Sequence, residues 1–410
     1  MQQNVISYYP TYALLDSIMS YSKYDTLNLY IDLKGIARPL YMEHTRINIV
    51  ESTKMARKTD SSFFTSLLEF FIFHKNYALK RGIKINFYVF YELGESFYHL
   101  NIDKKYKANR RIDNMPGLDK VGKEIFNDVI QKNLILIEKV FNKVPNIKII
   151  LSNHLEADFI PYYLIRNSLV PVTDNVCQLV YSNDHDLFQN IILGNNVYQF
   201  LKTKTKRVLK SGGEISSKYL KHECSIPDEY FPLIMAIMGD KGDGIIDKVK
   251  GAGEKTVPII IDELVHLVGG MDNLYDNVFN GKPIFQPDAE NETNDKVVYS
   301  AIEAERKRST ISKNLKLMSF ELLSRYLDNP PTTEVTQRRK HIYNVMNDST
   351  IARSEDIYSA LNKISILVES ENPLDILYLN KNINDYKFWG ELWVNMIIKK
   401  QNVVEQIVNF

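Results

Sequence analysis

The stretch LNLYIDL at residues 27–33 is a short apolar run that carries one acidic residue, Asp32, near its end. Its length and composition predict a buried strand. Similar runs occur at 83–91 (IKINFYVFY), 147–151 (IKIIL), 176–182 (VCQLVYS) and 197–201 (VYQFL), and helical patterns occur at 60–81, 120–143 and 156–168. Strands that alternate with helices predict an α/β fold, with a mostly parallel sheet flanked by helices.

The pattern divides the chain into three predicted regions. Residues 1–220 carry the alternation of strands and helices. Residues 221–330 are predicted to be a mainly helical subdomain with glycine-rich turns at 239–253 and a polar stretch at 270–297, which we expect to be an insertion loop. Pro330 and Pro331 mark a boundary, and residues 331–410 are predicted to form a helical C-terminal extension.

The composition excludes several classes of protein. The chain has 410 residues, of which 44% are hydrophobic and 25% charged, so we expect a globular protein. Two cysteines cannot form a disulfide framework or a thiolate zinc site. No secretory signal is recognised and no run of about 20 apolar residues occurs, which predicts a cytoplasmic protein without a membrane span. With a net charge of +1, any affinity for nucleic acid must come from the distribution of charge.

Carboxylates follow the predicted strands at the points where each strand ends. They are Asp32, Glu156 and Asp158 (which we expect to open a helix), Asp184 and Asp186 (on an extended segment), and Asp240 and Asp243 in a later turn. In an open α/β sheet these ends form one edge where ligands bind. Oxygen ligands favour Mg²⁺ or Mn²⁺ over zinc, and two such ions support phosphodiester hydrolysis. Each residue alone fits a helix cap or a solvated loop; the recurrence of carboxylates at several strand ends favours a metal site.

A basic segment, KKYKANRR at 104–111, follows the second strand. Basic residues around Tyr106 are suited to neutralising phosphates and stacking on a base, although such a run is also typical of a solvated loop. Lys107 and Arg110 are spaced i, i+3, so on a helix both would reach the acidic edge, where they would hold a scissile phosphate. Arg111 adds a third charge.

A second signal is GDKGDGIIDKVKGAGEKTV at 239–257. Gly251 and Gly253 precede a predicted helix start, so a nucleic-acid backbone could approach the amide groups there, and Lys248, Lys250 and Lys255 add positive charge. An ordinary glycine turn between helices is the alternative. The spacing does not match a nucleotide-binding P-loop. The basic groups at 202–210, 306–308 and 338–340 are interpreted as solvated faces.

Together these motifs resemble the 5′-nuclease (flap endonuclease) superfamily, especially phage 5′–3′ exonucleases, T-even phage RNase H and the 5′-nuclease domain of bacterial family-A DNA polymerases. The matching pieces, in the family's order, are YIDLKG at 30–35, YKANRRIDNMP at 106–116, HLEAD at 154–158, YSNDHDLFQ at 181–189, the 239–257 segment and KNLKLMSF at 313–320. The resemblance covers about residues 25–330 and leaves the C-terminal part unmatched.

The resemblance implies a PIN-like fold with two Mg²⁺ ions, which Mn²⁺ can replace, and cleavage of DNA or RNA–DNA hybrids near a 5′ end, flap or junction. It assigns the metal-binding role to Asp32, Glu156, Asp158, Asp184, Asp186, Asp240 and Asp243. It assigns phosphate contacts to Lys107 and Arg110 and support of a frayed end to Tyr106. Gly251 and Gly253 match a helix–turn–helix-like duplex clamp that often holds K⁺, and residues 107–143 match a helical arch.

The sequence departs from the family at two positions. Tyr91 stands where an aspartate is usual, with Glu92 next to it, and Phe159 replaces the second aspartate of the usual EADD. The main hypothesis is a replicative 5′ nuclease. Its C-terminal extension is expected either to dock replication proteins or to pack against the core. The alternatives are a DNA-binding relative with impaired metal binding and a PIN-type ribonuclease.

Overall fold

The structure is a computed structural model. It describes residues 12–21, 23–33, 70–71, 73–108, 138, 142, 146–201, 207–210, 227–253, 255–285, 293 and 295–348. Within them one sheet has the order β3-β2-β1-β4-β5-β6. Its strands are β1 (Thr26–Asp32), β2 (Lys84–Leu93), β3 (Ile147–Asn153), β4 (Val176–Tyr181), β5 (Val197–Leu201) and β6 (Arg207–Lys210). All neighbours pair in parallel except β5 and β6, so the predicted mostly parallel α/β sheet is confirmed.

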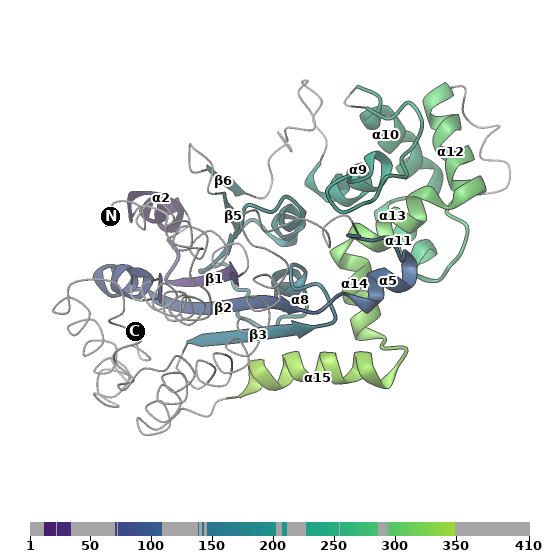
Figure 1. The fold of residues 1–410 in the computed structure, drawn as a ribbon. Helices are drawn as coiled ribbons and strands as arrows, with labels where there is room; N and C mark the ends of the chain where they lie inside the picture. Colours follow the sequence, from purple (N-terminus) through teal and green to yellow (C-terminus); the bar gives the residue numbers. More distant parts are fainter. Residues whose placement is uncertain are drawn as a thin grey trace, which may run out of the picture.

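The middle of the sheet is apolar because helices cover both faces. On one face, α2 (Tyr12–Tyr21) and the helical residues 73–81 pack against side chains such as Leu29 and Phe87. The other face carries α8 (Ile160–Arg166), the 3-10 helix η2 (Asp186–Leu193), α14 (Phe320–Asp328) and α15 (Thr333–Asn347). Figure 1 shows α15 lying along β3, the outermost strand.

A mainly helical region follows the sheet in sequence. It contains η3 (Asp228–Tyr230), α9 (Phe231–Met238), α10 (Val257–Val268), α11 (Met271–Phe279), α12 (Lys296–Arg308) and α13 (Thr310–Met318). Figure 1 shows this region beyond the arrowheads of β2 and β3, with α5 (Phe97–Ile102) leading from β2 into it. The core of the region also takes in Tyr106, Phe188 and Leu201 from the first 220 residues, so its apolar packing is continuous with the sheet.

One predicted helix is shorter than expected, and one predicted loop is wrong. The helix expected at 156–168 begins only at Ile160, because Ala157–Phe159 form a turn that precedes Pro161 in the first helical turn. The stretch 270–297 is not simply a loop: α11 lies within it, and its buried Leu274, Tyr275 and Val278 supply the apolar face. The polar residues between them hid that face from the sequence pattern.

Several other predictions concern residues of which the structure describes only a part. Residues 70–71 and 73–81 of the expected 60–81 helix are helical, whereas 60–69 and most of 120–143 lie outside the described residues. The boundary at 331 stays a prediction, and α15 beyond it contributes Val335, Ile342 and Val345 to the core of the sheet. None of the helices in the described parts is both long and apolar enough to cross a bilayer.

Candidate active site

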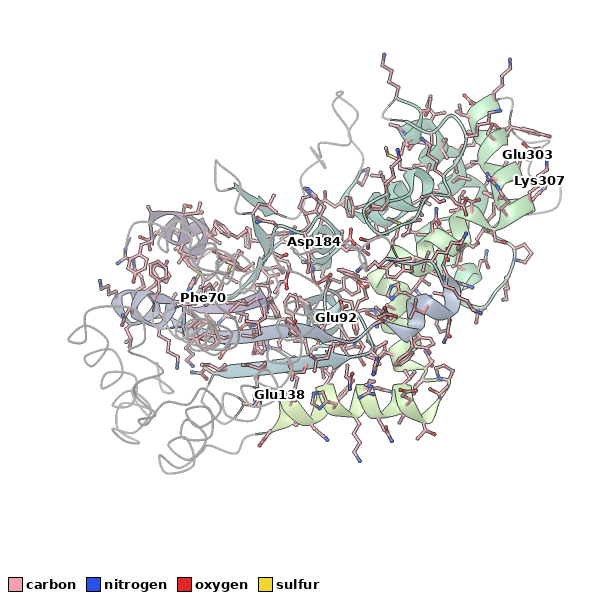
Figure 2. The ribbon with its side chains drawn as sticks, in the orientation of Figure 1. Phe70, Glu92, Glu138, Asp184, Glu303 and Lys307 are labelled. Atoms are coloured by element: carbon pink, nitrogen blue, oxygen red, sulfur yellow. The ribbon has the colours of Figure 1, made fainter. Side chains whose placement is uncertain are left out.

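The acidic residues come from four separate connections. Asp32 ends β1, Glu156 and Asp158 lie in the turn after β3, and Asp184 and Asp186 follow β4. Asp240 and Asp243 lie in the turn after α9. Figure 2 shows Asp184 and Glu92 at the side of the sheet that faces the helical region. Parallel strands bring their carboxyl ends to one edge, which places Asp32, Asp158 and Asp184 there although they lie far apart in the sequence. The turn after α9 adds Asp240 and Asp243.

Electrostatic coupling shows how closely these residues gather. Burial, followed by the charges of Asp32 and Asp184, raises the pKa of Asp158 well above its ordinary value, and Glu156 adds to the effect. Burial, followed by the charges of Asp184 and Asp243, likewise raises the pKa of Asp186. The carboxylates therefore form two overlapping groups, and Asp184 acts on both.

Lys107 is the cation inside this acidic group. Its Nζ lies 2.6 Å from Glu156 Oε1 and 3.6 Å from Asp243 Oδ2. Burial alone would lower the pKa of Lys107, but the neighbouring carboxylates, Glu156 first, outweigh burial and raise the pKa. The backbone of Lys107 is left-handed, with φ 51°, so it is not on the helix that the sequence suggested. Arg110 and Arg111 lie outside the described residues.

Tyr106 does not present its ring to solvent. Only 6% of the residue is exposed, and its ring stacks on His99 with centroids 4.5 Å apart. Its hydroxyl donates to Asp243 Oδ2 at 3.1 Å, and the backbone N–H of Lys107 donates to the Asp243 carbonyl at 2.9 Å. In this conformation the ring cannot stack on a frayed base; Tyr106 instead positions Asp243 and Lys107.

The buried His99 supports Tyr106 and was missed in the sequence. Its Nε2 lies 3.0 Å from the Leu317 carbonyl and its Nδ1 2.7 Å from Ser96 Oγ, so it links α5 to α13. Burial lowers the pKa of His99 to about 4. A lone histidine in an ordinary helical stretch gives no sequence signal of such a role.

The sequence predicted an extended segment at Asp184 and Asp186, but the chain turns there after β4. The N–H of Asp184 donates to Ser182 Oγ and the N–H of Asp186 donates to Asp184 Oδ1, both at 3.1 Å. Gln199 Nε2 donates to the carbonyls of Ser182 and Asp184. The side chains of Ser182 and Asp184 each accept a hydrogen bond from the backbone two residues later. Such local hydrogen bonds favour a turn over a continued strand.

Gly239 allows the turn that carries Asp240 and Asp243. Its φ is 68°, and a Cβ here would lie 2.8 Å from the Ile245 carbonyl oxygen, so a side chain does not fit. Within the turn, Asp240 Oδ1 accepts from the N–H of Gly242 at 2.7 Å. The tight turn brings the Asp243 carboxylate back beneath Tyr106.

The glycine turn at 251–253 leads into α10, as the sequence predicted. Gly251 has φ 83°, and Gly253 has open space where a Cβ would lie. Thr256 Oγ1 donates to the Gly251 carbonyl at 2.8 Å and accepts from the Gly253 N–H at 2.9 Å, so Thr256 fixes the turn. Lys248 and Lys255 are exposed beside it.

Tyr91 and Glu92 point to opposite faces of β2. Tyr91 packs with the core beneath α2, and burial, followed by the charge of Glu92, raises its pKa to about 12. It is therefore a neutral phenol at neutral pH. Glu92 alternates with Tyr91, and its charge contributes to the raised pKa of Lys107, so the Glu92 carboxylate faces the acidic group.

The acidic edge offers carboxylate oxygens, the ligand type that Mg²⁺ and Mn²⁺ prefer. The raised pKa values of Asp158 and Asp186 show that a negative charge on either side chain is unfavourable here unless a cation lies close by. In the described parts of the chain, no three histidine, cysteine, aspartate or glutamate side chains are arranged so that they could hold a metal ion. Lys107 supplies positive charge between Glu156 and Asp243 instead.

Comparison with known proteins gives structural matches only. No family model and no curated protein matches the chain. The bacteriophage T5 D15 protein co-crystallized with metal ions matches with a TM-score of 0.50 and 19% identity, covering 78% of this chain and all of that one. T5 5′-exonuclease with bound zinc matches equally well. A pseudo-enzyme–product complex of the T5 flap endonuclease with DNA and metal ions matches with a TM-score of 0.50 and 18% identity, over 79% and 100% of the two chains. The chain has the fold of the phage 5′-exonucleases, as the sequence motifs predicted.

Proposed function

We propose that the protein is a metal-dependent 5′ nuclease that hydrolyses phosphodiester bonds at junctions between single- and double-stranded DNA or RNA–DNA hybrid. The observation that carries the proposal is the gathering of carboxylates from four connections around Lys107, with the pKa of Asp158 and of Asp186 raised by burial and by their neighbours. The similar T5 proteins are described as an exonuclease and a flap endonuclease, which supports this choice.

The acidic edge would hold two Mg²⁺ or Mn²⁺ ions. The ligands we propose are Asp32, Glu156, Asp158, Asp184, Asp186, Asp240 and Asp243, with Glu92 as an addition in place of Tyr91. The chemistry that such ions supply when bound is activation of water and neutralisation of charge on the phosphate and leaving oxygen. Metal ions in the T5 structures support the choice of a divalent cofactor.

Lys107 and Arg110 would hold the scissile phosphate. Lys107 lies at the acidic edge and pairs with Glu156. If this ion pair opened, the Lys107 ammonium group could donate to a phosphate oxygen. Tyr106 keeps the Lys107 backbone and Asp243 in register. Gly251, Gly253, Lys248 and Lys255 would bind the duplex through phosphates, which fixes register without reading sequence. Arg111, next to Arg110 in the basic segment, would add a further contact to the nucleic acid.

The test is cleavage of a 5′-labelled flap and of an RNA–DNA hybrid with Mg²⁺ by the wild type and by Asp184→Asn. We expect the variant to lose cleavage while it still binds DNA, because Asp184 acts on both groups of carboxylates. Equal cleavage by the variant would remove Asp184 from the site. A wild type that cuts nothing in Mg²⁺ or Mn²⁺ would contradict the nuclease proposal.

The second candidate is a DNA-binding relative that has lost one metal site. Tyr91 favours it, because a phenol with a pKa of about 12 cannot replace a carboxylate ligand. Titration of Mn²⁺ into the wild type distinguishes the two: two binding events support the enzyme, and a single event that Glu92→Gln leaves unchanged supports the impaired relative.

Other parts of the proposal rest on the sequence. A K⁺ ion at the 251–253 turn stays a prediction; the Gly251 and Gly253 carbonyls already accept hydrogen bonds, from Thr256 and Val257. Docking of replication proteins on residues 331–410 and a location in the cytoplasm, that of the host if the gene is a phage gene, stay predictions as well.

A further inference from the structure

A basic cavity lies in the helical region, away from the acidic edge. It has a volume of about 700 Å³ and is bounded by the end of α5, the segment 281–285, the end of α12 and the first turns of α13. Four cations line it, namely Lys282, Arg306, Lys313 and Lys316. We call it the α12–α13 groove. The sequence had indicated only a solvated face at 306–308.

The charge of the α12–α13 groove is positive. Its one carboxylate, Glu305, is only 9% exposed and accepts hydrogen bonds from the N–H groups of Ile311 and Ser312 at 2.7 and 3.0 Å, and from the Ser312 hydroxyl. Glu305 is thus occupied in capping α13. Within the described residues, Lys282 and Lys316 form no ion pair, so their charges face the cavity uncompensated.

Lys313 ties the groove to the candidate active site. Its Nζ lies 2.6 Å from Asp103 Oδ2 and 3.7 Å from Asp247 Oδ2. Asp103 begins the turn that carries Tyr106 and Lys107, since its carbonyl accepts from the Tyr106 N–H. Asp247 follows the Asp243 turn, and Asn314 Nδ2 holds the Asp247 carbonyl at 2.8 Å. The same two turns therefore bear both the groove and the acidic edge.

The size and lining of the groove favour an unpaired strand. The volume lies in the range of small-ligand sites, which suits about one or two nucleotides and excludes a double helix. Ile284 and Phe285 lie buried at its wall, while Lys282 and Lys316 provide charge. The groove therefore offers its positive charge to the phosphates of a strand, and it offers no ring for base stacking.

We propose that the α12–α13 groove binds the phosphates of a single-stranded nucleic-acid segment that extends from the cleavage junction. The proposal rests on the proposed nuclease function and deepens it, because it assigns a binding site to the unpaired part of the substrate. Lys282 and Lys316 are the contacts, and neither belongs to the acidic edge or to the duplex clamp.

The experiment compares the full-length wild type, Lys282→Ala/Lys316→Ala and a matched control, Lys80→Ala/Lys84→Ala. The control removes two exposed lysines at the opposite end of β2. Binding of a ten-nucleotide single strand is measured without divalent metal at several salt concentrations. We expect the groove variant to bind about tenfold more weakly, with a salt slope smaller by about 1.4, because each single-strand phosphate contact contributes about 0.7. We expect the control variant to bind as the wild type does.

Two further measurements separate the possible failures. Cleavage of a blunt duplex should be equal in wild type and groove variant, whereas cleavage of a substrate with a long 5′ single strand should fall only in the groove variant. Inorganic phosphate serves as a competing probe. If the groove variant lost phosphate binding but kept strand binding, or matched the control throughout, the groove would not be a strand site. A wild type that cleaves neither substrate would instead contradict the proposed nuclease function.

Discussion

Lys107 shows how one side chain can serve two states of the same site. In the structure it neutralises Glu156 and Asp243, both of which are proposed metal ligands. A divalent ion and this ammonium group compete for the same oxygens. We therefore expect metal binding to release Lys107 toward the substrate phosphate.

Lys107→Ala is predicted to lower cleavage about 100-fold or more, because it removes a preorganised charge from the phosphate. The same change should tighten Mn²⁺ binding, since no lysine then has to be displaced. Both are measured against Lys105→Ala, an exposed lysine in the same turn. Weaker Mn²⁺ binding in Lys107→Ala would show that the lysine does not compete with the metal.

At the residue scale, the sequence predicted the position of the acidic residues at the strand ends better than their surroundings. Asp32 and Asp184 follow apolar runs, so their placement at one edge follows from the rules of parallel sheets. The roles of His99, Ser182 and Gln199 depend on tertiary contacts that have no local pattern. Tyr106 was misjudged for the same reason, since its burial depends on His99 and Asp243.

At the element scale, α5 and α13 are joined through His99. Its pKa of about 4 lies below the value of about 6.5 in an unfolded chain, so below pH 6.5 the unfolded state takes up more protons. Stability from this group is therefore present above pH 6.5 and is lost as the pH falls toward 4, by about 3 kcal/mol in total.

We predict that His99→Gln unfolds with a flatter dependence on pH than the wild type between pH 6.5 and pH 4. Urea unfolding at several pH values measures this, and the carboxylates that titrate in the same range are common to both proteins. Parallel pH profiles in the two proteins would mean that His99 is not held neutral. A second buried histidine, His74, has the same lowered pKa and stays unchanged in the comparison.

The turn before α10 is predicted to bind duplex DNA, and two substitutions test this. Lys255→Ala should weaken binding of a blunt duplex and reduce its salt slope by about 0.9, the contribution of one phosphate contact on duplex DNA. Thr256→Ala should weaken binding further without changing charge, because it removes the two hydrogen bonds that fix Gly251 and Gly253. An unchanged slope in Lys255→Ala would exclude that lysine from the clamp.

At the scale of the whole molecule, the sheet was predictable and its covering was not. Apolar runs between helical patterns predicted five strands to within a few residues. The sequence left open whether the residues after Pro330-Pro331 pack against the core, because a helix with few apolar residues gives no clear sign of a buried face. In the structure Ile342 and Val345 belong to the same core as Phe159 and Tyr163.

Ile342→Ala is accordingly predicted to lower the free energy of unfolding of the whole protein by about 2–5 kcal/mol, as for other buried aliphatic side chains. Lys340→Ala, an exposed change on the same helix, should cost less than about 0.5 kcal/mol. Calorimetry decides between the two views of α15. A loss confined to a small, separate transition would support the predicted extension.

The contact between α15 and β3 also has a consequence for how the protein is made. Lys148 of β3 donates to the Asp348 carbonyl at the end of α15, and the two residues are 200 positions apart. During translation β3 leaves the ribosome long before α15 has been synthesised. The edge strand β3 of the nascent chain is therefore exposed until α15 can pack on it. Contacts between residues far apart in sequence slow folding. Until they form, the exposed edge strand can pair with strands of other chains. We expect production of this protein to be sensitive to translation speed and to chaperones.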